Sequence, residues 1–254
     1  MKIICLNTWG GNAGKENLLS FFNKYKDDID VFCLQEVGYH PKGYEEVKDK
    51  NGKDIKVKIW GLKEIPKQLS NYIPYFRPHY YEDYGILIMV KNNLKILGEG
   101  EVFVHKDKNS VNHTNDEVGN HARNIQYITL DIEKEITTIM NFHGLWNGKG
   151  KTDSDDRLLQ SDKIIKFLKT LNTRIVLCGD FNLLPDTESI KRIEDFGLRN
   201  LIKEYDVKST RTSFYKKSDK FADYCLVSKD IKVKDFKVLP DEVSDHAPLY
   251  IEIE

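Results

Sequence analysis

The sequence of 254 residues lacks the features that mark several special classes of protein. No apolar run approaches the length that crosses a membrane, and residues 1–8 lack the long apolar core of a signal peptide. Basic and acidic residues nearly balance, at 39 and 40, so no global positive field indicates a protein that coats nucleic acid. An enzyme with a local basic cleft remains compatible with this balance.

Cysteine is scarce, and the four cysteines are Cys5, Cys33, Cys178 and Cys225. Each lies in an apolar run, and no two have the close Cys-x-x-Cys spacing that zinc sites use. We therefore expect small buried side chains in a reducing compartment rather than a zinc site. Together with the missing signal and membrane segments, this predicts a soluble cytoplasmic protein with no membrane partner, which we expect to be a monomer.

Repeats, low-complexity tracts and linker-like stretches are also absent, which predicts a single domain over residues 1–254. Helical spacing of apolar residues predicts helices at 17–25, 62–72, 153–171 and 187–196. Apolar runs of strand length occupy 3–6, 30–36, 85–90, 94–105, 125–132, 136–142, 175–178, 221–227, 231–238 and 248–253. So many strands with few helices between them favour an α/β (α+β) fold of two packed sheets with outer helices.

Three connections carry local signals. The turn at 91–93 suggests that strand 85–90 pairs with strand 94–105 as a hairpin. The Lys- and Glu-rich segment 39–59 contains Asn51-Gly52, which is typical of a hairpin turn. The polar segment 106–120 has no periodicity and the length of a functional or mobile surface loop.

The most informative stretch is 175–182, where a buried strand runs into Gly179 and is followed by Asp180 and Asn182. Residues two apart on an extended chain point the same way, so these two polar side chains can face one pocket. A carboxylate beside a carboxamide suits a hydrated Mg²⁺ and a phosphate oxygen. Taken alone, the stretch is equally consistent with a turn that Asp180 caps and Asn182 supports.

Other polar residues stand at the ends of apolar runs, where layered α/β folds place their chemistry: Asn7, Glu36, His143, Asp223, Asp245 and His246. Hard oxygen ligands favour Mg²⁺ or Mn²⁺ over zinc. Imidazoles add a proton carrier and a stabiliser of developing charge. Each residue alone also fits a turn, a cap or a surface ion pair, but the combination suits attack of water on a phosphate ester.

These residues lie in an ordered series of motifs: Leu6-Asn7-Thr8-Trp9, Leu34-Gln35-Glu36-Val37, Asn141-Phe142-His143, Gly179-Asp180-Phe181-Asn182, Ala222-Asp223-Tyr224 and Ser244-Asp245-His246. Across nearly its whole length the chain resembles the endonuclease/exonuclease/phosphatase superfamily of metal-dependent phosphodiesterases. The resemblance implies a deoxyribonuclease I-like, four-layered α/β/β/α sandwich of two packed mixed sheets. It also implies a Mg²⁺ cofactor, with Mn²⁺ as a substitute.

The resemblance implies roles for individual residues. Glu36 corresponds to the principal metal ligand, and Asn7 to a residue that supports the metal and its water shell. Asp245 corresponds to a residue that either binds the metal or holds His246. Asp180 corresponds to the acid that aims or deprotonates the attacking water. The implied phosphate ligands are Asn182, His246 and Arg123.

His143 stands where some branches of the superfamily have a histidine and the abasic-site enzymes have a tyrosine. The resemblance also implies that Asp223 orients His143. Two basic and aromatic segments, 144–151 and 210–217, supply further candidates for substrate contact: Trp146, Lys149, Phe214 and Tyr215.

These segments favour a nuclease or another nucleic-acid phosphodiesterase, with DNA ahead of RNA as the partner. The alternative is a phosphatase or phosphodiesterase acting on a small-molecule or lipid-linked phosphate. A binding module that only keeps the fold is the third hypothesis, but it would have no need of the complete set of polar residues.

Overall fold

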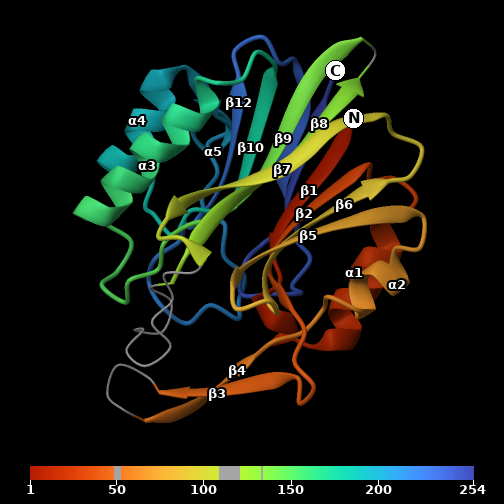
Figure 1. Ribbon diagram of the computed structural model, residues 1–254, viewed down its shortest axis with the longest axis vertical. Coiled ribbons are helices and arrows are strands. Elements are labelled where there is room, and N and C mark those ends of the chain that lie inside the picture. The colour runs from red at the N-terminus through yellow and green to blue at the C-terminus, as the bar shows by residue number, and fades with distance from the viewer. Residues whose placement is uncertain (49–52, 109–120, 133) are drawn as a thin grey trace.

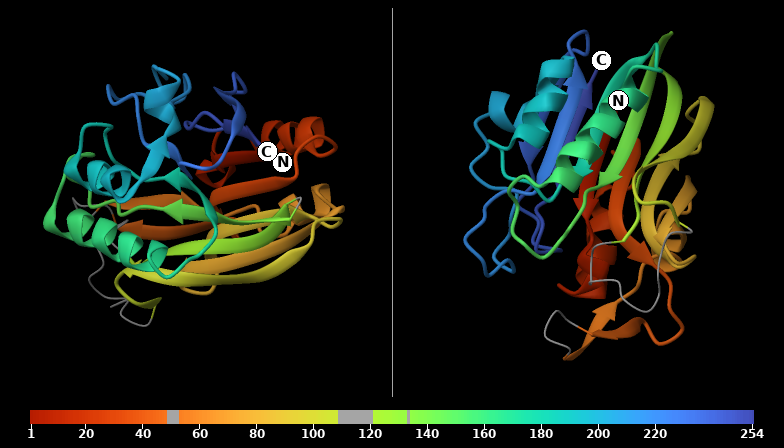
Figure 2. Two further views of the ribbon diagram at one scale, coloured as in Figure 1. Left: turned by 90° about the horizontal axis from the view of Figure 1, so that it is seen from above. Right: turned by 60° about the vertical axis from the view of Figure 1, so that its left-hand side comes forward.

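The computed structural model describes residues 1–254 except 49–52, 109–120 and 133. Two six-stranded sheets pack face to face, with helices on their outer faces (Figures 1 and 2). A separate two-stranded hairpin projects beyond one end of the sandwich (Figure 1). This arrangement confirms the expected α/β fold of two packed mixed sheets flanked by helices.

The first sheet contains both ends of the chain. In spatial order its strands are β13 (Val233–Val238), β14 (Leu249–Ile253), β1 (Lys2–Asn7), β2 (Val31–Gly38), β6 (Tyr84–Lys91) and β5 (Tyr72–Tyr80). β1 and β2 are parallel, whereas β1 and β14 are antiparallel. The C-terminal ends of β1 and β2 therefore lie at the same edge as the beginning of β14.

The second sheet repeats this pattern with different parts of the chain. Its spatial order is β11 (Leu198–Asn200), β12 (Asp223–Ser228), β10 (Arg174–Asp180), β9 (Glu135–His143), β8 (Arg123–Ile132) and β7 (Ile96–His105). β9 and β10 are parallel, and β12 runs antiparallel to β10. The hairpin outside both sheets consists of β3 (Tyr44–Lys48) and β4 (Asp54–Lys58).

Each sheet has its own covering helices (Figure 2). The first is covered by α1 (Lys15–Tyr25) and α2 (Glu64–Gln68), and the second by α3 (Asp155–Leu168), α4 (Glu188–Phe196) and the short α5 (Leu201–Glu204). These helices fall within the segments where helical spacing was found, apart from α5 and the start of α1. Among the described residues, no helix is both long enough and apolar enough to cross a membrane.

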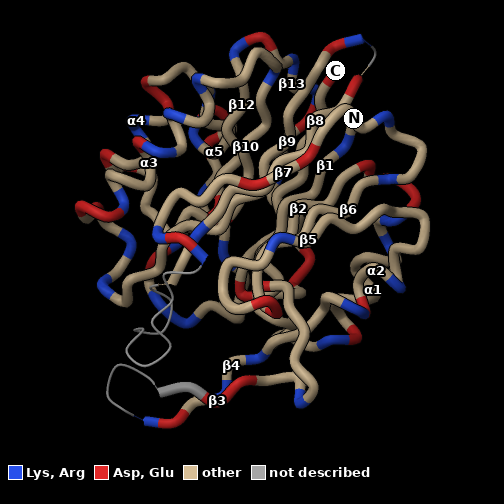
Figure 3. The backbone as a smooth tube through the Cα atoms, viewed as in Figure 1, with Lys and Arg blue, Asp and Glu red and all other residues tan. Residues whose placement is uncertain are grey.

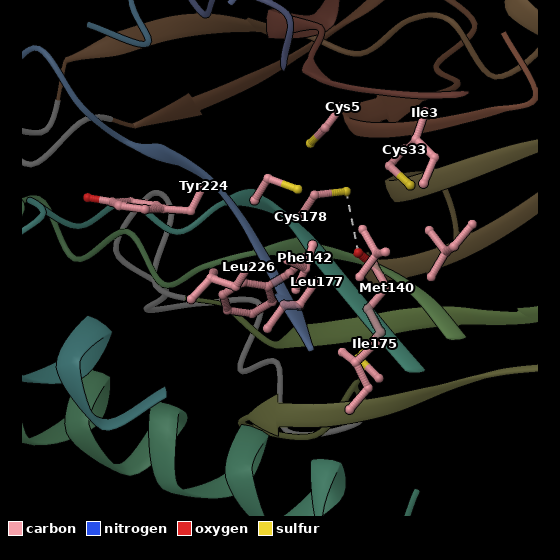
Figure 4. Packing of buried hydrophobic residues seen from close by; sticks show 14 of the residues in the cluster. Ile3, Cys5, Cys33, Met140, Phe142, Ile175, Leu177, Cys178, Tyr224 and Leu226 are labelled. Atoms are coloured by element: carbon pink, nitrogen blue, oxygen red, sulfur yellow. Dashed lines mark hydrogen bonds between the residues drawn. The ribbon is translucent and has the colours of Figure 1, made fainter. Parts of the chain in front are cut away.

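The alternation of side chains along β1 explains the layering. Ile3 and Cys5 point into the space between the sheets, while Ile4 and Leu6 pack under α1. The four cysteines are all free and buried, as expected. Figure 4 shows three of them, Cys5, Cys33 and Cys178, among the apolar side chains of the core. Figure 3 shows that charged residues are rare along β1, β2, β9 and β10, as strands buried on both faces require.

The predicted hairpin of strands 85–90 and 94–105 is wrong. β6 lies in the first sheet, between β2 and β5, whereas β7 lies in the second sheet beside β8. Because both edges of β6 are already occupied, the chain leaves the turn at 91–93 and crosses to the other sheet. The expected turn at Asn51-Gly52 and most of the expected loop 106–120 lie outside the described residues.

The approach of β9 to β10 at Gly179 generates a prediction about stability. Gly179 has a φ of +154°, and a Cβ atom built there would lie 1.9 Å from the backbone oxygen of Phe142. Gly179→Ala should therefore lower the free energy of unfolding by about 3 kcal/mol or more, measured by urea denaturation. Gly98→Ala on β7 is the control, because its Cβ would meet nothing within 4 Å. Equal stability of the two variants would contradict this account of the strand packing.

Candidate active site

Three of the expected site residues share one row of the second sheet. The register pairs His143 with Asp180 across β9 and β10, and Asp180 with Asp223 across β10 and β12. Asp223 thus opens β12 rather than lying inside the expected strand 221–227. Because neighbours in register point to the same face of a sheet, all three side chains meet at its edge.

The first sheet contributes Asn7 and Glu36 to the same place. The Asn7 amide Nδ2 donates to Glu36 Oε1 at 3.1 Å and to Asp180 Oδ2 at 3.0 Å, so one side chain joins the two sheets. Glu36 has a φ of +55° at an irregularity in the pairing of β2 with β6. This bulge redirects Glu36 toward the site instead of leaving it in the regular alternation of the strand.

Asn182 also has a left-handed backbone, with a φ of +54°. Its backbone N–H donates to Asp180 Oδ1 at 2.8 Å, and its Nδ2 lies 3.4 Å from the carbonyl of Gly144. Asp180 therefore has one carboxylate oxygen held by Asn182 and the other held by Asn7. Strained backbone at a polar cluster is typical of sites where geometry is fixed by function.

His246 is the residue that Asp223 orients. Its Nδ1 lies 2.8 Å and 2.9 Å from the two carboxylate oxygens of Asp223, and its Nε2 lies 3.6 Å from Asp180 Oδ2. The expected pairing of Asp223 with His143 is therefore wrong. The beginnings of β12 and β14 both reach this edge, and that brings Asp223 and His246 together. Burial raises the pKa of Asp223 to about 6 and lowers the pKa of His246 to about 4.

His143 faces the carboxylates from the other side. Its Nε2 lies 3.8 Å from Asp180 Oδ2 and 3.9 Å from Glu36 Oε1. Burial, reinforced by nearby Arg123, lowers the pKa of His143 well below its ordinary value. The imidazole is therefore neutral at physiological pH.

The excess of carboxylates makes this site attractive to a cation. Burial raises the pKa of Glu36 to about 7, and the nearby charges of Asp245 and Asp180 add to that effect. Ligand atoms of Glu36, His143 and Asp180 lie within 4.8 Å of one another, as do those of Asp180, Asp223 and His246. The carboxylate oxygens of Glu36 and Asp180 fit a hard divalent cation. The amide oxygen of Asn7 accepts from the Trp9 backbone N–H, so Asn7 supports the two carboxylates through its Nδ2 and is not itself an oxygen ligand.

Asp245, the third expected metal-supporting residue, lies at the rim of this cluster. Its Oδ2 is 3.3 Å from Arg211 Nη1, and its Oδ1 is 3.8 Å from His246 Nε2. It belongs to neither of the groups close enough to share one ion. The geometry therefore places it beside Arg211 and His246 rather than with Glu36.

Arg123, the expected phosphate ligand, is only 2% exposed at the start of β8. Burial lowers its pKa, and attraction to Tyr84, Glu36 and Asp180 opposes that shift. A fully buried guanidinium beside carboxylates remains charged, because its ordinary pKa lies far above neutrality. Arg123 therefore supplies fixed positive charge on the floor of the site.

The expected substrate contacts lie on two neighbouring loops. Tyr215 is half-buried, with the Lys151 amine 4.8 Å from its ring centre and the Arg211 guanidinium 4.1 Å from it. The Lys217 amine lies 5.4 Å from the ring of Trp146, which ties the two loops together. Lys149 is exposed and Phe214 is half-buried.

Sequence reasoning missed several residues that the structure brings to this place. Lys151 is 3% exposed, and burial lowers its pKa to about 8. Arg211 contacts Asp245, as described above. Directly beneath the carboxylates, Gln35 Nε2 donates to Asn141 Oδ1 at 2.6 Å across the two sheets. Gln35 and Asn141 stand in the motifs quoted above, and Lys151 and Arg211 in the basic segments, but no local pattern distinguishes them from their neighbours.

The Asp223–His246 contact predicts that these two residues act as one unit. Asp223→Ala and His246→Ala should each lower kcat for a chromogenic phosphodiester by about 100-fold or more. The double variant should be no slower than the slower single variant, because each change already disables the pair. The losses of Asp223→Ala and His143→Ala should instead multiply. Multiplying losses for Asp223 with His246 would contradict the pairing.

Comparisons with known proteins agree with this fold. The solved mannosyl-6-phosphatase of Bacteroides thetaiotaomicron is 18% identical, with a TM-score of 0.74 over 100% of this chain and 99% of that one. A family protein from Leptotrichia buccalis is 20% identical, with a TM-score of 0.71 over 100% and 99%. The human Nocturnin catalytic domain is 18% identical, with a TM-score of 0.68 over 100% and 93%. At these identities the likeness concerns the fold alone.

No match was found among the curated proteins. The model of the endonuclease/exonuclease/phosphatase family, however, matches residues 4–246, which include the site residues from Asn7 to His246. The chain therefore belongs to the endonuclease/exonuclease/phosphatase family, whose members are hydrolases that act on phosphate esters.

Proposed function

We propose that this protein is a Mg²⁺-dependent phosphodiesterase that hydrolyses nucleic acid by in-line attack of water on phosphorus, in the cytoplasm. One observation supports this chemistry above all. Glu36 and Asn7 from one sheet meet Asp180 from the other, and Asn7 donates hydrogen bonds to both carboxylates. Glu36 and Asp180 would hold the cation, and Asn7 would keep their carboxylates in place. When bound, Mg²⁺ neutralises charge on the phosphoryl group and the leaving oxygen.

The remaining residues divide the work around the phosphate. Asp180, fixed by Asn182 and Asn7, aims the attacking water along the line opposite the leaving oxygen. Arg123 and Asn182 hold non-bridging oxygens by preorganised electrostatics. Asp223 accepts the Nδ1 proton of His246, so the neutral imidazole turns the lone pair of Nε2 toward the site, where it can take up a proton and then bond to a phosphate oxygen. His143 offers a second N–H donor from the opposite side.

The choice of nucleic acid rests on the distribution of charge. The connection after β2 (39–63) has seven lysines and four acidic residues, the loop after β9 (144–151) has two lysines, and the loop before β12 (208–220) has five basic residues and one acidic residue. These segments contain 14 of the 39 basic residues but only 5 of the 40 acidic residues. Each segment directly follows or precedes a strand that carries a site residue, so its described part would attract a long polyanion to the site.

Two acidic residues near the same edge already accept hydrogen bonds from other parts of the protein, which reduces their repulsion of a polyanion. Asp241 accepts from Lys24 at 2.7 Å, and Glu242 accepts from the backbone of Ser213 at 2.9 Å. In Figure 3 the β3–β4 hairpin carries residues of both signs, so it offers discrete positive positions rather than a uniform basic surface.

One observation favours a smaller substrate as the second candidate. Lys151 and Arg211 both lie against Tyr215, so that ring is not available for stacking a base, and the two cations suit one compact phosphate group. The Bacteroides structure reported above is named a mannosyl-6-phosphatase. A phosphatase acting on a sugar phosphate therefore stands as the alternative.

A substrate panel separates these candidates. Single- and double-stranded DNA, RNA, a chromogenic diester and mannose 6-phosphate are each incubated with Mg²⁺ and then with EDTA. We expect nucleic acid to be cleaved, with activity lost in EDTA and reduced about 100-fold or more in Glu36→Gln and Asp180→Asn. The exposed Asp186→Asn is the matched control and should keep full activity. Turnover of mannose 6-phosphate with every nucleic acid intact would contradict the nuclease proposal.

Charge-reversal variants test whether the basic segments bind the DNA backbone. Lys216→Glu/Lys220→Glu should raise KM for DNA and flatten its dependence on salt, because phosphate contacts release counterions. Lys166→Glu/Lys169→Glu, at the end of α3 away from the site, changes the net charge equally and should leave KM unchanged. Equal effects of the two double variants would contradict local recognition of the polyanion.

A further inference from the structure

His143 lacks the partner that usually orients a functional imidazole. Its Nε2 faces the carboxylates of Asp180 and Glu36, but its Nδ1 is buried and accepts or donates no hydrogen bond among the described residues. The side chain is 4% exposed, so bulk water does not serve this nitrogen. A buried polar atom without a partner calls for a specific explanation.

A second buried imidazole lies beside it. His79 on β5 is 0% exposed, and its ring centre is 5.6 Å from that of His143, with the planes inclined by 56°. Its Nε2 also lacks a partner among the described residues. No direct hydrogen bond joins the two rings. Two buried imidazoles therefore stand side by side, each with one nitrogen left over.

Hydrogen bonds fix the proton of His79. Asn124 Nδ2 donates to Glu101 Oε2 at 2.6 Å, because a carboxylate only accepts. The amide oxygen of Asn124 therefore faces His79 Nδ1, 3.1 Å away, and that nitrogen must carry the proton. It follows that Nε2 of the neutral His79 carries no proton and has a free lone pair that can accept a hydrogen bond.

The site fixes the proton of His143 in the same way. Its Nε2 faces two carboxylate oxygens at 3.8 Å and 3.9 Å, and their negative charge favours a proton on that nitrogen. Nδ1 of His143 then also carries no proton and can only accept a hydrogen bond. Two acceptors cannot bond to each other, so each needs a donor, and a single water with its two protons can satisfy both.

We propose that one buried water donates a proton to His79 Nε2 and the other to His143 Nδ1, and that His79 is thereby the positioning residue of His143. The relay runs from Glu101 through Asn124 and His79 to the water and His143. The rings of His121 and Tyr84 lie 5.2 Å and 5.6 Å from that of His79 and enclose it. The kinetic consequence rests on the proposed function, whereas the tautomer of His143 does not.

Imidazole ¹⁵N NMR of the metal-free protein tests the relay directly. The His143 signal, assigned by its loss in His143→Gln, should be that of the Nε2–H tautomer with a hydrogen-bonded Nδ1. His79→Phe should shift the Nδ1 resonance toward that of a nitrogen without a partner, whereas His79→Gln keeps an acceptor for the water and should restore it. A protonated Nδ1 in the unchanged protein would overturn the proposal, even if His79→Phe failed to fold.

Kinetics supply the second readout. His79→Phe should lower kcat by about 10-fold to 100-fold with KM nearly unchanged, and His79→Gln should recover most of that loss. His121→Phe keeps a neighbouring ring but removes the nitrogen that donates to the Ala122 carbonyl, and it should change neither kcat nor the His143 signal. Unaltered NMR and kcat in His79→Phe, or a His79→Gln variant as impaired as His79→Phe, would overturn the proposal.

If none of the variants hydrolyses any phosphate ester, the proposed function fails, but the NMR outcome still decides whether His79 orients His143. The two claims are thus tested separately.

Discussion

The site depends on a polar bridge between two sheets that otherwise meet through apolar side chains. Asn141 uses its whole amide in this bridge: Oδ1 accepts from Gln35, and Nδ2 donates to the carbonyls of Leu34 and Leu87. One layer nearer the edge, Asn7 repeats the connection by donating to Glu36 and Asp180. Buried polar groups are costly unless satisfied, so these amides allow a single relative placement of the sheets. That placement brings the carboxylates of both sheets together.

With the two sheets fixed relative to each other, the register of the strands determines which side chains meet at the site. A single row across β9, β10 and β12 delivers His143, Asp180 and Asp223, and the start of β14 delivers His246 to Asp223. The resulting cluster is buried, which raises the pKa values of Glu36 and Asp223, and neighbouring carboxylates add to the shift at Glu36. A folded protein accepts such an arrangement where it serves binding or chemistry. The electrostatic cost of gathering these carboxylates favours binding of a divalent cation, and Arg123 and the two histidines suit a phosphate beside it.

The buried strands, their polar ends and the family could be predicted from the sequence, because each depends on a short local stretch of residues. The apolar run 175–178 indicates a buried strand, and Asp180 and Asn182 after Gly179 indicate a polar end. The order of the motifs indicates the family. Partner choice could not be predicted in the same way. Whether Asp223 meets His143 or His246 depends on the spacing of strands in two different sheets, and the crossing after β6 depends on β5 already occupying its edge. His79 carries no local signal at all, because its role arises only where β5 packs near β9.

The measurement that tests the account most directly is an anomalous diffraction map from crystals of the protein grown with Mn²⁺, as a visible substitute for Mg²⁺. The account predicts one strong peak between the two sheets, with oxygen atoms of Glu36 and Asp180 about 2.1 Å from it. Arg123 and His246 should not touch the ion. A peak bound by Asp223 and His246 instead, or no peak at this edge at millimolar Mn²⁺, would contradict the claim that the bridge between the sheets exists to build a metal-dependent phosphoester hydrolase.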